Sequence, residues 1–215
     1  MYSHIRIRFL APKTPYLRDS VLQTMKLTIP ELSLVVLIGP SGCGKSTFAA
    51  KHFRATEMIS SDHCRALVAD DENDMGATPA AFRILHSIAR ERLRSGRIAV
   101  VDATSVQPES RKPLVALAAK QDCLPVAIVF DLPEELCVAR NRGRTNRNLP
   151  AGVIRRQRDQ MKRSMKGLQG EGFRFVYVLD SVEAVDSAVI ERQPLSLNRD
   201  LGVLGLESEP VEPAP

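Results

Sequence analysis

The segment GPSGCGKST, residues 39–47, carries the clearest chemistry of the sequence. It matches the pattern GxxxxGK followed by Ser or Thr, with an apolar run before it and a helical pattern after it. Glycines let backbone N–H groups turn inward around a phosphate, and the helix start adds the positive end of its dipole. Lys45 can reach the β- and γ-phosphates of a nucleoside triphosphate, and the Ser46 hydroxyl can complete the coordination of Mg²⁺. The predicted nucleotide-binding residues are Gly39, Ser41, Gly42, Gly44, Lys45, Ser46 and Thr47.

This motif does not distinguish a kinase from an ATPase or a GTPase. The residues that would act on a phosphate acceptor have to be sought elsewhere in the sequence. A short strand predicted over residues 57–60 is followed by Asp62 and Arg65. The carboxyl end of this strand neighbours the phosphate loop in a parallel sheet, so Asp62 is placed to take the proton of an attacking hydroxyl. Arg65, one helical step later, could hold an acceptor phosphate. On spacing alone, Asp62 fits equally well as the N-cap of the helix that follows, and both interpretations stay open.

Arg140 and Arg144 are separated by four residues in a predicted helix and would share one face of it. A basic lid of this kind closes over a triphosphate and neutralises the charge that develops during transfer. The alternative is a solvated basic helix. Residues 140–166 contain ten Lys or Arg and one acid, a net charge of +9 in a chain whose total is +5. This concentration of positive charge suits a polyanionic partner.

Other acidic residues are weaker candidates for a role in binding Mg²⁺. Asp102 ends a predicted strand, where it could act on Mg²⁺ through water or cap the loop that follows. The acidic run of residues 70–74 is better explained as a solvated loop than as a metal site.

The composition is that of a folded protein, with 44% hydrophobic and 26% charged residues in 215. The longest apolar run, residues 34–38, is far shorter than the about 20 residues that cross a bilayer, so no membrane association is expected. The four cysteines form no metal-binding spacing and predict reduced thiols in a cytoplasmic protein. We predict an N-terminal extension over residues 1–24, upstream of a true start at Met25. A kinase domain is predicted over residues 25–194, and a disordered tail or linker over residues 195–215.

Strand and helix patterns alternate along the domain. They predict an α/β P-loop NTPase fold, in which a parallel sheet of four to five strands has helices on both faces and a basic helical lid. Strands are predicted at residues 34–38, 57–60, 97–101, 125–130 and 173–179. Helices are predicted at residues 46–53, 79–94, 108–120, 133–142, 154–168 and 182–190.

Several further motifs follow the phosphate loop in order: ISSDHCR, VADDEND, VVDATS, RNRGRTNR, MKRSMKGLQGEGFR and ERQP. Together they resemble the kinase domain of the bacterial polynucleotide kinase-phosphatase family of RNA repair enzymes, over about residues 25–194. The resemblance implies transfer of the γ-phosphate of ATP, or another NTP, with Mg²⁺ to the 5′-OH end of RNA or DNA. It implies that Asp62 is the general base, that Arg65 binds the acceptor strand, and that Lys45, Arg140 and Arg144 serve the triphosphate.

Two departures from the family pattern are visible. Ser105 stands where Asn usually follows Asp-Ala-Thr, and no His and Asp clusters of a phosphatase follow the kinase motifs. Phosphatase and ligase modules in partner chains, and a homodimer, stay open. Two alternative functions also stay open: a small-molecule or toxin-type P-loop kinase, and a module that binds NTP or RNA without catalysis.

Overall fold

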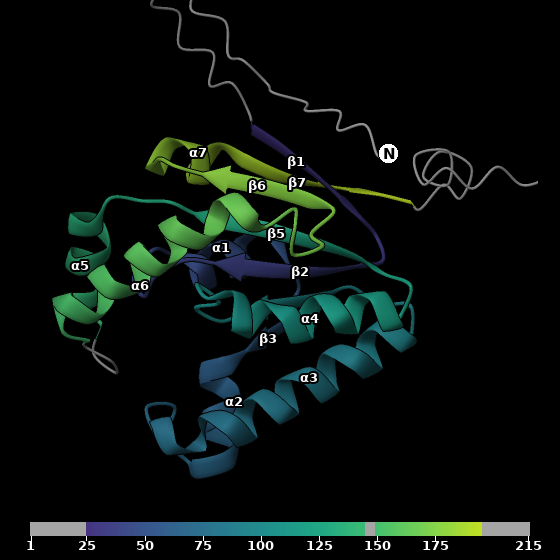
Figure 1. The fold of residues 1–215 in the computed structure, drawn as a ribbon, viewed down its shortest axis with the longest axis horizontal. Coiled ribbons are helices and arrows are strands. Elements are labelled where there is room, and N and C mark those ends of the chain that lie inside the picture. The colour runs from purple at the N-terminus through teal and green to yellow at the C-terminus, as the bar shows by residue number, and fades with distance from the viewer. Residues whose placement is uncertain (1–24, 145–148, 195–215) are drawn as a thin grey trace, which may run out of the picture.

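The computed structural model describes residues 25–144 and 149–194. The predicted extension at residues 1–24 and the predicted tail at residues 195–215 lie outside these ranges. Within them, two parallel sheets and their helices form one layered body (Figure 1). The strands are β1 (Met25–Pro30), β2 (Ser33–Ile38), β3 (Met58–Ser60), β4 (Ala99–Asp102), β5 (Leu124–Phe130), β6 (Phe175–Leu179) and β7 (Ala188–Gln193).

Helices connect the strands. The α-helices are α1 (Lys45–His52), α2 (Ser61–Ala69), α3 (Thr78–Arg94), α4 (Pro108–Lys120), α5 (Glu134–Arg142), α6 (Ala151–Ser164) and α7 (Val182–Ser187). Short 3₁₀ turns are η1 (Ala55–Glu57), η2 (Met75–Ala77) and η3 (Met165–Gly167). No helix in the described ranges is both long and apolar enough to span a bilayer.

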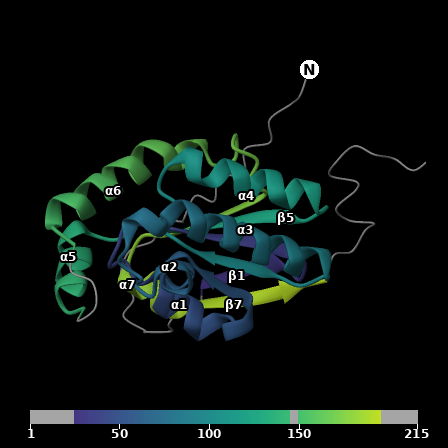
Figure 2. The ribbon, with the colours of Figure 1, turned by 90° about the horizontal axis from the view of Figure 1, so that it is seen from below.

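The main sheet has five parallel strands in the order β3-β4-β2-β5-β6. This confirms the predicted parallel α/β sheet. Every residue of β2 is buried, because the strand lies at the centre with layers on both faces. Leu34 and Val36 pack on one face with α3 and α4, and Val35 and Leu37 pack on the other with α1 and β1. Figure 2 shows α4 and α6 on one side of the sheet, and α1 and β7 on the other.

The predicted helix over residues 182–190 is wrong at its end. Helix α7 stops at Ser187, and the chain continues as β7, which pairs in parallel with β1 from Met25↔Ala188 to Pro30↔Gln193. The two-stranded sheet buries Leu27, Ile29 and Ala188 against the core beneath it. Because this hydrogen-bonded partner comes from the other end of the domain, the local pattern of the sequence could not show it.

Candidate active site

The phosphate loop leaves the carboxyl end of β2 and enters α1. Two of its glycines have left-handed backbones, Gly42 with a φ of +82° and Gly44 with a φ of +99°. A Cβ at Gly42 would lie 2.2 Å from the carbonyl oxygen of Cys137, so the loop packs directly on the backbone of α5. Gly44 is the N-cap of α1. Glycine is therefore required at Gly42 by both conformation and space.

Lys45 is turned back across this loop. Its ammonium Nζ donates to the carbonyl oxygens of Gly39 at 2.9 Å and Pro40 at 3.0 Å, and it lies 3.6 Å from Cys43 Sγ. The side chain is 9% exposed. A positive charge is thus held at the loop, where the N-terminus of α1 also favours an anion. Ser46 and Thr47 follow in the first turn of α1 and are exposed.

A small cavity of about 30 Å³ joins the phosphate loop to the acceptor side. Five of the predicted site residues line it, namely Ser41, Lys45, Ser46, Asp62 and Arg144. Asp102 lines it as well. Asp102 ends β4, in register with Leu37 of β2 on one side and Ser60 of β3 on the other. The carboxyl ends of three neighbouring strands therefore bring these residues together.

Asp62 is not the N-cap of α2, which corrects one of the two interpretations. Ser60 is the cap, and its hydroxyl accepts a 3.3 Å hydrogen bond from the backbone N–H of His63. Asp62 lies in the first turn instead, forms an ion pair with Arg65 through its Oδ1, and accepts a 3.4 Å hydrogen bond from Ser61 Oγ. The carboxylate side chain remains 37% exposed, so it is accessible from the cavity.

Arg65 is buried, with 3% exposure. Its Nε donates a 2.7 Å hydrogen bond to the carbonyl oxygen of Glu72, and its other end pairs with Asp62. Arg65 therefore holds the acidic loop of residues 70–74 against α2 and orients the carboxylate. In the described residues, no group of three or more His, Cys, Asp or Glu could hold a metal ion.

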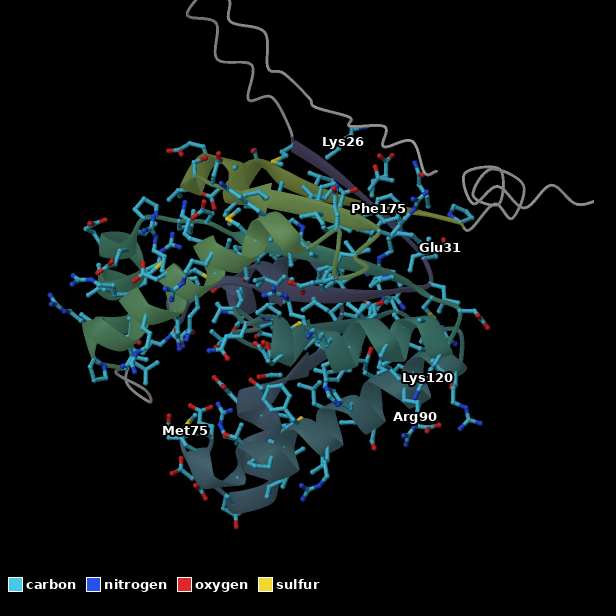
Figure 3. All side chains as sticks on the ribbon, viewed as in Figure 1. Lys26, Glu31, Met75, Arg90, Lys120 and Phe175 are labelled. Carbon is cyan, nitrogen blue, oxygen red and sulfur yellow. The ribbon has the colours of Figure 1, made fainter. Side chains whose placement is uncertain are left out.

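A second, larger cavity of about 250 Å³ opens beside the first. The two cavities share Ser61, Asp62 and Thr104. The walls of the larger one are mainly uncharged, with Phe82 and Met75 beside hydroxyl and amide groups. Met75 is labelled in Figure 3, on the turn that follows α2. Asp62 is thus positioned between a cationic loop and a roomy polar pocket.

The two lid arginines do not share a helix face, which is a second correction. Helix α5 ends at Arg142, and Arg144 lies past its C-cap, Gly143. Arg144 reaches the small cavity from this loop. Arg140 stays in the last turn of α5, and its Nη1 lies 3.3 Å from the position that a Cβ would take on Gly44. Both guanidinium groups therefore approach the phosphate loop by different routes.

Sequence reasoning missed two residues that hold the site together. The backbone N–H of Ser41 donates a 2.8 Å hydrogen bond to Oε1 of Gln157 on α6. Arg111 is fully buried, pairs with Glu171 at 2.5 Å and 2.8 Å, and donates to the carbonyl oxygen of Ser105 at 2.9 Å. Ser105 has a left-handed backbone with a φ of +45°, so this contact fixes a strained turn beside the larger cavity. Neither residue belongs to a recognisable motif.

The Cys137 thiol, which lies beside the phosphate loop, is a poor nucleophile. All four cysteines are buried and free. Burial, and next the neighbouring Cys43, raise the pKa of the Cys137 thiol to about 11. A thiol with such a pKa is almost fully protonated near neutral pH and is a poor nucleophile.

The ionic and oxygen groups of the small cavity suit Mg²⁺ as a partner of bound phosphates. Mg²⁺ prefers oxygen ligands and keeps several waters, so one or two protein oxygens are sufficient. The Ser46 hydroxyl and the Asp102 carboxylate line the same cavity and provide such oxygens.

Known proteins are similar to the described domain in sequence and in fold. A profile of the AAA_33 family, described as an AAA domain, matches residues 34–168. The phosphate import ATP-binding protein PstB 3 of Streptococcus pneumoniae is 41% identical over 54 residues, which make up 25% of this chain and 22% of that protein. This chain therefore spans less than a quarter of that relative's length.

A chain of known structure shares this fold. A chain from the Pnkp1/Rnl/Hen1 RNA repair complex superposes with a TM-score of 0.55 and 21% identity, over 70% of this chain and 48% of that chain. Shikimate kinase from Acinetobacter baumannii, in complex with shikimate, superposes with a TM-score of 0.44 and 17% identity, over 81% and 94%. The predicted P-loop fold is confirmed, and this chain belongs to the AAA_33 family; the fold agrees with the resemblance stated from the sequence motifs.

Proposed function

Because this chain belongs to the AAA_33 family and has the fold of a P-loop kinase, we propose that it transfers the γ-phosphate of ATP, or another nucleoside triphosphate, to the 5′-OH end of RNA or DNA. The observation that carries the proposal is the position of Asp62, which lines both cavities. A base must stand between the nucleotide and the acceptor for in-line transfer.

In the proposed reaction, the Asp62 carboxylate takes the proton of the acceptor hydroxyl. The hydroxyl oxygen then bonds to the γ-phosphorus, and the bond from that phosphorus to the β–γ bridging oxygen breaks. The nucleoside diphosphate leaves with this electron pair, and the proton stays on the carboxylate. Positioned acid–base catalysis of this kind contributes about 10²–10⁴ to a rate.

The cationic side chains would serve the triphosphate. Lys45, already beside the loop, would exchange its carbonyl partners for phosphate oxygens. Arg140 and Arg144 would neutralise charge on the transferring group, as arginines do in related chemistry. Ser46 would hold Mg²⁺ in the cavity that Asp102 also lines, and the cation would supply positive charge to the phosphates there.

Arg65 would bind the acceptor through its link to the base. It pairs with Asp62 and lines the larger cavity from within the wall. A phosphodiester entering that cavity would compete for the guanidinium and release the carboxylate for proton transfer. The same residue would therefore sense the acceptor and orient the base.

A nucleic acid acceptor is supported by two features. Residues 140–166 carry a net charge of +9, and phosphate neutralisation supplies much of the affinity for nucleic acids. The similar chain of known structure comes from an RNA repair complex. We propose that residues 25–194 act as the kinase domain, and that phosphatase and ligase steps come from partner chains.

A small hydroxylated metabolite is the second candidate acceptor. The larger cavity, at about 250 Å³ with mainly uncharged walls, is close in size to pockets that enclose small ligands. Such an acceptor would use the same base and the same loop. Such an acceptor would not itself bind the basic stretch, which would serve only the triphosphate through Arg140 and Arg144, so its phosphorylation would be much less sensitive to salt.

The deciding experiment offers γ-labelled ATP together with 5′-OH RNA, 5′-OH DNA and a panel of small alcohols. We expect label at the 5′ end of the oligonucleotides, and a loss of at least about 100-fold in kcat for Asp62→Asn. Glu135→Gln makes the same chemical change at an exposed position of α5 and is the matched control. Label on small alcohols alone would support the second candidate, and undiminished transfer by Asp62→Asn would reject the base.

A further inference from the structure

Another cavity, lined by cationic side chains, lies at the amino ends of the strands of the main sheet, whereas the phosphate loop lies at their carboxyl ends. It has a volume of about 290 Å³ and is bounded by the chain just before β3 and β4 and by the end of β7. The phosphate loop follows the other end of β2, and a six-residue strand is roughly 20 Å long. Glu31, which lines this cavity, is labelled at that far edge in Figure 3. The two cavities are therefore separate sites.

Arginine dominates the walls of this cavity. Four arginines and two glutamates line it, a net charge of +2 from these six residues, which are Arg54, Arg92, Arg97, Arg192, Glu31 and Glu57. The arginines come from three segments of the chain that meet only in the folded protein: Arg54 before β3, Arg92 and Arg97 at the end of α3 and just after it, and Arg192 in β7. Such convergence distinguishes the cluster from a run of charge along one helix.

One of the four arginines is already neutralised. Arg192 donates to both carboxylate oxygens of Glu57, at 2.9 Å and 2.6 Å, and its guanidinium carbon lies 5.7 Å from the centre of the Phe53 ring. Glu57 is 5% exposed. This bidentate pair is a fixed wall of the cavity and adds no net charge to it.

The other three arginines have no such partner. Among residues 25–144 and 149–194, no carboxylate lies within ion-pair distance of Arg54, Arg92 or Arg97. Arg92 is anchored by a 2.9 Å hydrogen bond from its Nε to the carbonyl oxygen of Ile98. This contact leaves both terminal nitrogens of Arg92 available. Burial is the largest influence on Arg92 and lowers the pKa of its guanidinium, and the charge of the nearby Glu57 carboxylate opposes this shift.

We propose that this cavity binds a phosphate group, as a second anion site distinct from the phosphate loop. Arg92 would donate through its terminal nitrogens, and Arg54 and Arg97 would close over the anion from the exposed rim. Guanidinium forks match the oxygen spacing of phosphate and are weakly hydrated, so arginine rather than lysine suits the task.

The neighbouring groups fit this ligand. Thr56 and Gly96 also line the cavity, and they provide a hydroxyl and an unshielded backbone. No atom lies within 4 Å of the position that a Cβ would take on Gly96, which has a φ of +66°. An oxyanion can therefore approach the main chain closely at this turn.

The test uses the full chain, labelled with ¹⁵N, and follows backbone amide signals while inorganic phosphate is added at constant ionic strength. We expect saturable shifts at Thr56, Gly96 and Arg97, separate from any shifts at Gly42 and Gly44. The variant Arg97→Glu should weaken binding at the second site by at least about 10-fold, because it replaces a donor with a repelling charge.

Arg94→Glu is the matched control, because it makes the same charge change on the exposed surface of α3 outside the cavity. The affinity of Arg94→Glu for phosphate at this cavity should stay within about two-fold of that of the wild type. Arg54→Glu is a second variant from another segment, expected to behave like Arg97→Glu. Absence of shifts at the three amides, or an equal loss in Arg94→Glu, would overturn the proposal.

A parallel titration with a short single-stranded oligonucleotide distinguishes two sources of the phosphate. Saturation by inorganic phosphate alone identifies a free phosphate or phosphate monoester as the ligand. Saturation by the oligonucleotide alone identifies the phosphodiester backbone. Either result would support the site, and the Arg97→Glu variant must weaken whichever ligand binds.

Discussion

The backbone N–H of Ser41 and the side-chain oxygen of Gln157 are joined by a 2.8 Å hydrogen bond across 116 residues of chain. Ser41 belongs to the phosphate loop, and Gln157 projects from the second turn of α6. Helix α6 also buries Ile154 and Met161, one in each of the two hydrophobic clusters that flank the main sheet. The loop is thus hydrogen-bonded to a helix that is itself anchored in both hydrophobic clusters.

Gln157→Leu removes this acceptor while keeping a side chain of similar size. One lost hydrogen bond of this kind costs about 1 kcal/mol, so we expect the KM for ATP to rise by about five- to ten-fold. Steady-state kinetics at varied ATP gives the measurement. Arg163→Gln, at an exposed position on the same helix, should leave this KM unchanged. A similar rise in both variants would assign the effect to α6 in general.

Arg144→Ala is expected to lower kcat by about 100-fold or more, because a guanidinium beside the transferring phosphate acts mainly in the transition state. The KM for ATP should change much less. Arg142→Ala is the control, two residues earlier, exposed, and outside both cavities. Equal losses in the two variants would show that only the overall positive charge of the segment matters.

Gly42→Ala should destabilise the protein by about 3 kcal/mol, because an added Cβ meets the Cys137 carbonyl in a left-handed backbone. Gly152→Ala makes the same change in the first turn of α6, where nothing lies within 4 Å of the added atom. It should stabilise the protein by about 0.5–1 kcal/mol. Urea unfolding of both variants measures the contrast, which a neutral Gly42→Ala would contradict.

Glu57→Gln tests the buried pair with Arg192. Hydrogen bonds from Arg192, more than any other cause, hold the pKa of Glu57 below its ordinary value of about 4.5. The pair therefore stabilises the fold fully above that pH, and this stability is lost as the pH falls through the lower pKa of the folded protein. We expect Glu57→Gln to lower the free energy of unfolding by about 2 kcal/mol at pH 7.

The same loss should shrink as the pH falls below about 4.5, because protonation of Glu57 then weakens the pair in the wild type too. Urea unfolding at pH 7 and at pH 3 gives the comparison. Glu191→Gln changes an exposed neighbour of Arg192 and should have little effect at either pH. A penalty for Glu57→Gln that is independent of pH would show that packing, and not charge, accounts for it.

Much of the fold could be predicted because its signals are local. The phosphate loop is a contiguous motif, and α4 begins and ends as the sequence predicts, at Pro108 and Lys120. The positions of Lys45, Ser46 and Asp62 followed from strand ends in a parallel sheet, and these residues do line one cavity. Their catalytic and binding roles, with those of Arg65 and Arg140, stay predictions.

The misses share a physical cause, which is dependence on distant contacts. The chain after Ser187 is a strand because β1 supplies its hydrogen bonds, and β1 lies at the other end of the domain. Gln157 matters only because α6 folds back onto the phosphate loop. The arginine cavity at the amino ends of the strands is lined by four separate segments of the chain, so no local sequence pattern could indicate it.

The parallel pairing of β1 with β7 also determines how the domain would respond to force. Tension that pulls Met25 and Gln193 apart acts along the strands, so the load is shared by the six paired positions between them. A ladder pulled in shear has to lose its hydrogen bonds together, whereas one pulled from a single end unzips bond by bond. Stretching this domain by its two ends should therefore meet its greatest mechanical resistance at the first step.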